Sequence, residues 1–380
     1  MKISVNTKEL KEAIAITKNA MVKKPALEVL ECVKLMTDDN ELIVEQNTLD
    51  NIYQVRMDCN SVEQGFAIIK FKELESLLKS VKADTIEIET EGNVCKITSG
   101  STLFKIVNKS YDEFPLIPDL KFDTEKDIVL KQKAFKDMLK KVLFAVGDDD
   151  SRPVLQAVNF VTEGDRLEMV AIDGYRMAIA KTSKLMKDVV AQQVLIKGSD
   201  LEKVQKLLTV SDDPVTIWVS PKYARITFDS KGKEVAVLSR LIEGDYMKYK
   251  DIIPTSSIVQ IETSVSEIKG CFEIGNSINP TAKKEKRIIT LVAEDDKLEF
   301  SASTENGTSS EYIYVNRSGN RDAIDMNFNA DYVKDIFNAV NCERIRVFFN
   351  GALAPVVVET DNLLKTYTDG ELYLILPLRK

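Results

Sequence analysis

The chain has 380 residues, of which 44% are hydrophobic and 29% are charged, and its formal net charge is −8. It contains no histidine, so the commonest general base, the usual triad member and the commonest metal ligand are missing. No Walker A loop, dinucleotide-binding glycine motif or nucleophile elbow occurs in the sequence, which argues against hydrolases and nucleotide-binding enzymes.

The cysteines are scattered along the chain, and none forms a C-x-x-C pair that would suggest a zinc site. No apolar run approaches the roughly 20 residues that span a bilayer. No continuous apolar stretch follows the early lysine of "MKISVNTKEL", so we expect no signal peptide. These features predict a cytoplasmic protein without a membrane partner.

Two signatures each occur three times along the chain. In the first, a short alternating strand leads into a helical pattern, as in "KISVNTKELKEAIAITKNAM" from Lys2, "DIVLKQKAFKDMLKKVLFAV" from Asp127 and "SIVQIETSVSEIKGCFEIGN" from Ser257. The second comprises "AIIKFKELESLLKSV" from Ala67, "VLIKGSDLEKVQKLL" from Val194 and "MNFNADYVKDIFNAV" from Met326. The equivalent residues Ile69, Ile196 and Phe328 are 127 and 132 residues apart, a period that has the size of a domain.

Strand-like segments with turns lie between these helices. The chain therefore predicts an α+β class of fold with three tandem domains, each of two helices and antiparallel sheets. The proline-bearing stretches "EFPLIPDL" and "KYKDIIPTS" precede the expected boundaries. We expect domains at residues 1–124, 125–254 and 255–380.

The stretch "AIDGYRMA" (residues 171–178) predicts a hairpin turn at Asp173-Gly174. Tyr175 and Arg176 follow this turn at once. A large aromatic residue and an arginine at such a position either hold the hairpin together or form a surface that a partner binds.

Lysines gather in the helical segments, whereas acids gather in strands and turns such as "TDDNE", "GDDDS" and "AEDDK". One interpretation is that the helices present lysines to a phosphate backbone. The alternative is that lysine, a good helix former, occupies exposed helix faces. Lysines without aromatic stacking motifs suit contact with the backbone of a nucleic acid better than reading of bases.

Several further stretches occur in a characteristic order: "KKPALEVLECVKL", "YDEFPLIP", "SRPVLQAVNF", "VAIDGYRMAIA", "SRLIEGDYMKYKDIIP", "NFNADYVKDIFNAV" and the C-terminal "YLILPLRK". Together they resemble the bacterial sliding clamp, the β subunit of DNA polymerase III, over the whole chain. The resemblance implies a head-to-tail homodimer that forms a six-domain ring around double-stranded DNA, without sequence specificity. It also implies a processivity factor with no catalysis, cofactor or metal, which the replicative polymerase, the clamp loader and repair proteins bind through short peptides.

The resemblance places a peptide-binding pocket around the Asp173-Gly174 turn. By matching motif, the pocket comprises Leu155, Ile172, Gly174, Tyr175, Arg176, Met177, Met247, Ile252, Asn329, Tyr332, Leu374, Leu376, Pro377, Leu378 and Arg379. Aliphatic and methionine side chains supply an adaptable surface for several partners. The same side chains are also ordinary core residues of strands, so both roles stay open for Leu155, Ile172 and Leu374.

The resemblance also assigns contacts to DNA and to the second subunit. The residues expected at DNA are Lys24, Lys11, Lys79, Lys136, Lys140, Arg152, Lys197 and Lys203. For the dimer, the edge strand "TLFKIVN" supplies Phe104 and Ile106, and the third domain of the partner supplies Ile274 and Ile278.

The chain departs from the family at two places that matter. Tyr175 stands where the family often has histidine, which reshapes that half of the pocket. The loop with Asp148, Asp149 and Asp150 would repel phosphate, and three carboxylates also suit a hard cation. Two alternatives therefore remain beside the DNA clamp: a clamp-like peptide-binding scaffold that is not loaded on DNA, and a metal-dependent enzyme centred on these aspartates and Asp173.

Overall fold

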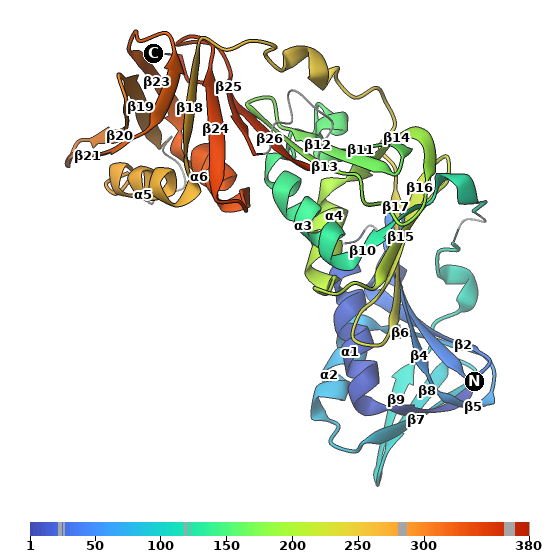
Figure 1. Ribbon diagram of the computed structural model, residues 1–380. Coiled ribbons are helices and arrows are strands. Elements are labelled where there is room, and N and C mark those ends of the chain that lie inside the picture. Colours follow the sequence, from blue (N-terminus) through green and yellow to red (C-terminus); the bar gives the residue numbers. More distant parts are fainter. Residues whose placement is uncertain are drawn as a thin grey trace. The chain divides into compact units, whose positions relative to one another are not determined.

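The computed structural model describes residues 1–21, 25, 27–117, 120–121, 123–279, 287–360 and 369–379. The chain divides into two compact units, which we describe separately. Unit 1 comprises Met1–Lys136 with Ser199–Leu241, and unit 2 comprises Asp137–Gly198 with Ile242–Lys380. Figure 1 gives the element labels. Among the described helices, none is long and apolar enough to cross a bilayer.

Unit 1 contains two antiparallel sheets. One has eight strands in the order β10-β15-β16-β17-β4-β3-β2-β6, and the other has five in the order β5-β1-β7-β8-β9. The strands are β1 (Lys2–Asn6), β2 (Cys32–Asp38), β3 (Glu41–Asn47), β4 (Asn51–Asp58), β5 (Asn60–Glu63), β6 (Phe66–Lys70), β7 (Thr85–Glu91), β8 (Val94–Ser99), β9 (Thr102–Val107), β10 (Ile128–Lys131), β15 (Pro214–Val219), β16 (Tyr223–Asp229) and β17 (Glu234–Arg240).

Unit 2 also contains two antiparallel sheets. The larger has nine strands in the order β14-β11-β12-β13-β26-β25-β24-β18-β22, and the smaller has the order β21-β20-β19-β23. The strands are β11 (Ala157–Gly164), β12 (Arg166–Ile172), β13 (Arg176–Thr182), β14 (Val189–Lys197), β18 (Val259–Ser264), β19 (Ile288–Glu294), β20 (Lys297–Thr304), β21 (Gly307–Tyr314), β22 (Asn316–Gly319), β23 (Ile324–Asn329), β24 (Arg344–Phe349), β25 (Val356–Glu359) and β26 (Gly370–Ile375).

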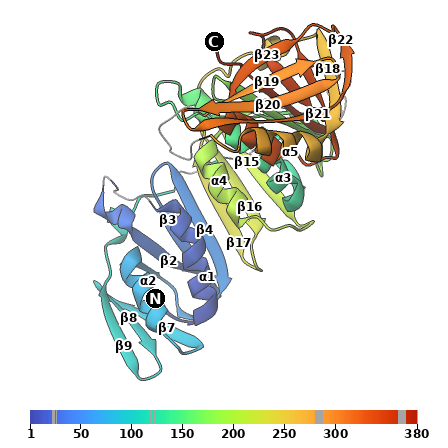
Figure 2. The ribbon, with the colours of Figure 1, turned by 90° about the vertical axis from the view of Figure 1, so that its left-hand side faces the viewer.

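The predicted strand-to-helix transitions are confirmed in all three repeats. The helices that follow β1, β6, β10, β14, β18 and β23 are α1 (Thr7–Thr17), α2 (Phe71–Ser80), α3 (Gln132–Val142), α4 (Gly198–Leu207), α5 (Val265–Gly275) and α6 (Ala330–Ala339). α1 begins where the Asn6 side chain accepts hydrogen bonds from the first-turn amides, and Ser264 caps α5 in the same way. Buried Phe135 and Leu139 sit four residues apart on α3, and α1 packs against β3 and β4 (Figure 2).

The threefold repeat extends to individual hydrogen bonds. In each repeat, the first amide of the first helix donates to a backbone carbonyl in the loop that follows the second helix. The bonds are Thr7 N to Asp84 O (2.8 Å), Gln132 N to Asp213 O (2.9 Å) and Val265 N to Glu343 O (2.9 Å). The same local sequence pattern therefore folds the same way three times.

A lysine on the first helix of each repeat reaches the C-terminal end of the second helix. The bonds are Lys11 Nζ to Val81 O (3.0 Å), Lys136 Nζ to Leu208 O (2.6 Å) and Lys269 Nζ to Asn338 Oδ1 (3.3 Å). The carbonyl end of a helix carries partial negative charge and has unsatisfied acceptors, so a lysine stabilises it. These lysines tie the two helices of each repeat together.

Each repeat contributes two half-sheets. Half-sheet A comprises β2, β3, β4 and β6 in the first repeat, β11–β14 in the second, and β19, β20, β21 and β23 in the third. Half-sheet B comprises β1 and β7–β9, then β10 and β15–β17, then β18 and β24–β26. Half-sheet A of one repeat joins half-sheet B of the next, through β4 with β17 and through β13 with β26. These joints leave β9 and β21 as edge strands.

Candidate functional site

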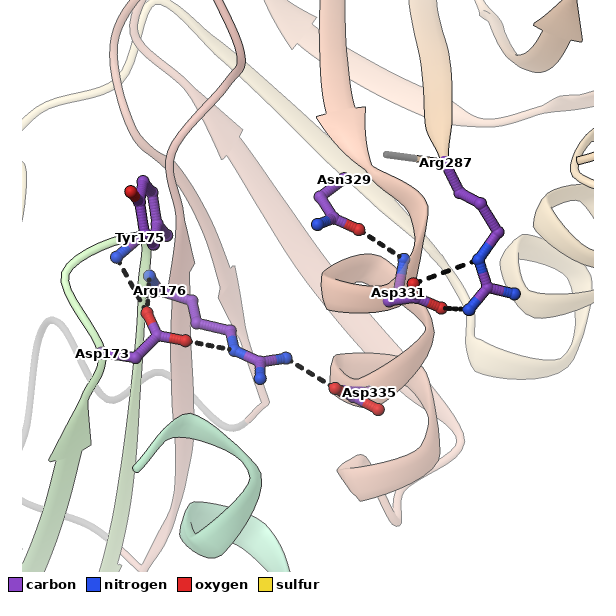
Figure 3. A network of polar contacts seen from close by, with 7 residues as sticks. All are labelled: Asp173, Tyr175, Arg176, Arg287, Asn329, Asp331 and Asp335. Carbon is purple, nitrogen blue, oxygen red and sulfur yellow. Dashed lines mark hydrogen bonds and ion pairs between the residues drawn. The ribbon is translucent and has the colours of Figure 1, made fainter. Parts of the chain in front are cut away.

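The predicted hairpin turn at Asp173-Gly174 is confirmed between β12 and β13. Gly174 has φ +95°, a conformation that favours glycine. One carboxylate oxygen of Asp173 accepts the backbone amides of Tyr175 (2.8 Å) and Arg176 (2.9 Å), which closes the turn, as Figure 3 shows. Asp173 is therefore a structural residue of the turn.

Arg176 fastens this turn to α6. Its Nε donates to Asp173 Oδ2 at 2.8 Å, and its Nη1 donates to Asp335 Oδ2 at 2.6 Å (Figure 3). The guanidinium also lies over the ring of Tyr332, 4.2 Å from the centroid, and near the ring of Phe144. The side chain is only 10% exposed, so the guanidinium is largely occupied by contacts within its own chain.

Tyr175, by contrast, is 58% exposed. Its ring centroid lies 6.1 Å from that of Tyr332, at a tilt of 33°. Burial raises the pKa of the Tyr332 phenol, and the nearby Asp173 carboxylate raises it further, so Tyr332 stays protonated. The two rings form an aromatic pair beside the turn.

The N-terminus of α6 is held by its own polar pair. Asn329 is the N-cap and accepts the Asp331 amide at 2.9 Å. The Asp331 carboxylate in turn pairs with the Arg287 guanidinium, with Nε 3.1 Å from Oδ2 (Figure 3). The side-chain oxygen of Asn329 is thus already bonded to the first turn of α6.

The C-terminal tail runs beside the turn. The Leu376 amide donates to the Tyr175 carbonyl at 2.9 Å, and the Leu378 amide donates to Asn327 O at 2.7 Å. Leu376 and Arg379 are exposed, whereas Pro377 and Leu378 are half-buried. The structure therefore brings the predicted tail and turn residues together.

Four of the predicted pocket residues are core side chains in this structure. Leu155, Ile172, Met177 and Leu374 are all buried, in one apolar cluster with Tyr246 and other residues. The core interpretation thus describes the packing of these four side chains, which form the floor under the turn. Leu155 lies in a short 3-10 helix (Pro153–Gln156), however, and not in a strand. The exposed apolar part of the predicted pocket comprises Tyr175, Met247, Ile252 and Leu376.

The segment that carries Met247 and Ile252 is anchored by two buried tyrosines. The Tyr246 hydroxyl donates to Val170 O at 3.4 Å, and the Tyr249 hydroxyl donates to the buried carboxylate of Glu168. Lys181 pairs with the same carboxylate at 3.0 Å. Sequence reasoning missed this anchor, for which the two tyrosines three residues apart in "DYMKYKD" were the available signal.

The predicted DNA-contacting residues differ in how free their charges are. Lys11 and Lys136 bind helix ends, as described above, while Lys79 pairs with Glu75 at 3.4 Å and Arg152 with Asp149 at 3.0 Å. Lys197 and Lys203 are half-buried. Lys140 is exposed and forms no ion pair within the described part of the chain. Lys24 lies outside the described residues.

The predicted dimer residues lie on an edge strand and around the end of a helix. Phe104 and Ile106 are half-buried on β9, the last strand of the five-stranded sheet. Ile274 is exposed near the end of α5, and Ile278 is half-buried in the turn that follows. Their neighbours Leu103 and Val107 on β9 are 52% and 65% exposed, so this edge strand is apolar on both faces.

The acidic loop has internal partners. Asp149 accepts hydrogen bonds from Ser151 and from Arg152, which lower its pKa, and Asp150 accepts one from Gln156 at 2.8 Å. Within the described ranges, no group of three or more His, Cys, Asp or Glu side chains is placed to hold a metal ion. The loop has the geometry of a hydrogen-bonded turn.

Three family models match consecutive parts of the chain. They describe the DNA polymerase III beta subunit: its N-terminal domain at residues 1–118, its central domain at 129–248 and its C-terminal domain at 250–378. The chain belongs to the DNA polymerase III beta subunit family. Its three tandem clamp domains are therefore the three sequence repeats.

Relatives and solved structures agree with this family. The chain is 23% identical to the beta sliding clamp of Haemophilus influenzae and 26% identical to that of Streptomyces coelicolor, over 99–100% of each chain. The solved sliding clamp of Bacillus subtilis matches with a TM-score of 0.90 at 23% identity, over 100% of this chain and 99% of its own. The DNA polymerase III subunit beta of Pseudomonas aeruginosa matches with 0.88 at 19%, over 100% of both chains. These structures share the beta subunit fold.

Proposed function

We propose that this protein is a DNA sliding clamp. It encircles double-stranded DNA without sequence specificity and tethers the replicative polymerase, which makes synthesis processive. The observation that carries the proposal is that all three beta subunit domains occur in order along the whole chain. The relatives named beta sliding clamp support it over the same length.

Partners bind at the exposed apolar surface around the Asp173-Gly174 turn. A short peptide places its aliphatic and aromatic side chains against Met247, Ile252 and Leu376, and Tyr175 supplies an aromatic edge. The buried floor of this site and the Arg176 bonds to Asp173 and Asp335 hold its walls in place before the partner arrives. Polymerase, clamp loader and repair proteins would compete for this one surface.

Two chains close head to tail around DNA in the cytoplasm, and the protein performs no catalytic step. Topological linkage keeps the partner at a high local concentration near the primer end, so tight binding to DNA is unnecessary. Weak backbone contacts from lysines such as Lys140 are sufficient for sliding. The free cysteines are consistent with a reducing compartment.

Retention on closed DNA tests the proposal directly. The purified protein is loaded onto nicked circular plasmid with the clamp loader of its host and ATP, and the DNA is then separated by gel filtration. We expect the protein to travel with the circle and to be released when a restriction enzyme linearises it. If the protein leaves the DNA equally fast whether or not the circle is cut, it does not encircle the DNA.

A clamp-like scaffold that is not loaded on DNA is the second candidate. It is favoured by the net charge of −8 and by the internal use of the Lys11 and Lys136 head groups. The scaffold predicts that a peptide from the C-terminus of the host polymerase binds in fluorescence anisotropy, although no protein is retained on circular DNA. Peptide binding together with retention would exclude it.

A further inference from the structure

The two sheet joints within the chain carry the same hairpin turn. At the β13–β26 joint in unit 2, the turn at Asp173 lies beside the C-terminal tail, and the Leu376 amide donates to Tyr175 O. At the β4–β17 joint in unit 1, the turn between β3 and β4 lies beside the end of β17, and the Arg240 amide donates to Asp50 O at 3.0 Å. The backbone around the proposed partner surface of unit 2 is therefore repeated in unit 1.

The sheet under each turn has the same register as well. Three residues on adjacent strands stand opposite one another at equivalent positions. In unit 2 they are Met177, Leu374 and Val357. In unit 1 they are Ile52, Leu238 and Arg225. The apolar side chain is thus kept at the first two positions, and an arginine stands at the third.

A hollow of about 180 Å³ lies over these residues of unit 1. Buried Ile52 and Leu238 supply apolar lining, Arg225 contributes its charge, and Ile117 and Leu120 from the segment after β9 complete it; we call this site the joint hollow. Pockets for whole small molecules are usually about 300–1,000 Å³, so the joint hollow has a volume that suits one side chain of a peptide.

The turn beside the joint hollow presents an unusual leucine. Leu49 holds the position equivalent to Gly174, and it has φ +73°, in the left-handed region that favours glycine. Its side chain is 50% exposed, so packing within the chain does not require it. Backbone strain at an exposed apolar residue is typical of a site that contacts a ligand.

Buried Asn47 holds this turn against the segment after β9. Its side-chain oxygen accepts the Leu49 amide at 2.9 Å, and its side-chain nitrogen donates to Pro115 O at 3.2 Å. Leu116 and Ile117, which follow directly, are exposed. Exposed aliphatic side chains from two segments are therefore gathered at the joint hollow.

A buried polar group fastens the turn to α4. The Asn51 side chain donates to Asp200 Oδ1 at 2.9 Å, and the Ser239 hydroxyl donates to Asp200 Oδ2 at 2.7 Å. In unit 2, Arg176 fastens the equivalent turn to α6. Both turns are thus held in place before any ligand arrives, which lowers the entropy cost of binding.

Arg225 gives the joint hollow a charge that needs a partner. The side chain is half-buried, and its guanidinium forms no hydrogen bond or ion pair within the described part of the chain. Arg56 on β4, by contrast, pairs with Glu41 at 2.7 Å. A partly desolvated guanidinium binds a carboxylate through charge-assisted hydrogen bonds. Val357 at the equivalent position in unit 2 cannot do so.

We propose that the joint hollow is a second docking site for partner peptides, which binds an aliphatic side chain next to a carboxylate. The aliphatic side chain packs on Ile52 and Leu238 between Leu49 and Ile117, and the carboxylate pairs with Arg225. The inference rests on the proposed binding of partner peptides to this protein, and it adds a second site with its own chemical preference.

Nuclear magnetic resonance of the full chain, labelled at isoleucine methyl groups, tests the site. The probe is a dipeptide of two leucines with an acetylated N-terminus and a free C-terminal carboxylate. We expect the methyl signals of Ile52 and Ile117 to shift and to saturate as the dipeptide is added. The signals of Ile172 and Ile252 report separately on the proposed partner surface of unit 2.

Two comparisons test the role of the charge. The same dipeptide with an amidated C-terminus should bind the joint hollow roughly tenfold more weakly, because it cannot form charge-assisted hydrogen bonds with Arg225. Arg225→Met should weaken binding of the free acid by a similar factor and abolish its advantage over the amide. Lys222→Met removes an exposed positive charge from the turn before β16 and should leave both affinities unchanged.

Leu49→Gly separates binding from folding. Glycine adopts the left-handed backbone without strain, so this variant should melt at the same temperature as the wild type or higher. It should nevertheless bind the dipeptide more weakly, because an aliphatic contact is lost. Unchanged affinity in Leu49→Gly would remove this residue from the site.

The outcomes distinguish the new site from the proposed function. Shifts at Ile172 and Ile252 without shifts at Ile52 and Ile117 would overturn the second site while the proposed partner surface stands. Shifts at Ile52 and Ile117 that ignore both amidation and Arg225→Met would overturn the recognition of a carboxylate. Saturable shifts at Ile52 and Ile117 that need the carboxylate and Arg225 support the inference.

Discussion

At the scale of single residues, the sequence left two roles open for Tyr175 and Arg176: to hold the hairpin or to form a surface for a partner. In the structure the two residues differ. Arg176 is held by two carboxylates and two aromatic rings of its own chain, whereas Tyr175 is exposed. Motif matching could find both residues but not this division, because Asp335 is far away in the sequence. The burial of Leu155 and Ile172 was likewise undecided, since apolar strand residues look alike in a core and in a groove.

Replacing Arg176 with Met should destabilise unit 2. The change leaves Asp173 nearly buried without its partner and removes the second bond to half-exposed Asp335, so we expect the free energy of unfolding to fall by roughly 2–4 kcal/mol. Urea denaturation measures it. The control Lys334→Met changes an exposed residue on α6, the helix that carries Asp335, and it should lower the free energy of unfolding by less than about 0.5 kcal/mol. Equal effects of the two variants would contradict the fastening role.

The ion pair between Glu12 and Lys233 predicts a pH dependence. The hydrogen bond from Lys233, with its charge, lowers the pKa of the Glu12 carboxyl despite partial burial. Because the pKa of this carboxyl is lower in the folded state, the ion pair stabilises the protein at pH values above the ordinary carboxyl pKa of about 4.3. This stabilisation is lost as the pH falls through the pKa of the folded state. The melting temperature of the wild type should therefore exceed that of Glu12→Gln at pH 7. This difference should shrink as the pH falls below the ordinary carboxyl pKa and disappear below the lowered pKa of Glu12. A constant difference would refute the assignment.

At the scale of elements, the strand-to-helix transitions followed from the sequence because each combines a period-2 run with a helical one. The lysines on these helices were harder to interpret. Charge counting groups Lys136 with Lys140, but Lys136 is half-buried and bonded to Leu208 O, whereas Lys140 is exposed. Only the position of the second helix distinguishes a lysine that ties helices together from one that faces solvent.

Lys136→Met and Lys140→Met should therefore affect different properties of the protein. Lys136→Met should lower the free energy of unfolding by about 1–2 kcal/mol, because a charged hydrogen bond at a helix end is lost. Lys140→Met should leave stability unchanged but reduce the salt dependence of binding to a short duplex, by about one unit of slope. Denaturation and fluorescence anisotropy check the two effects. A stability loss in Lys140→Met alone would reverse our assignment.

At the scale of the whole molecule, the threefold repeat and the family resemblance predicted the α+β class and the tandem clamp domains, and the family models confirm both. The sheets that run from one repeat into the next were not predicted. The pairing of β4 with β17 joins residues that are far apart in the sequence, such as Val55 and Val235. Strand patterns alone do not reveal such partners. The edge position of the strand that contains Phe104 was predicted, and the sheet order confirms it.

The proposed function requires two of these chains to close into a ring around DNA. Negative-stain electron microscopy of the purified protein, with two-dimensional class averages, tests it most directly. We predict a ring of six lobes with an open centre, from three domains in each of two chains. Three-lobed crescents would mean that the contacts between the first domain of one copy and the third domain of the other are too weak to close the ring. A compact particle without a hole would contradict the account.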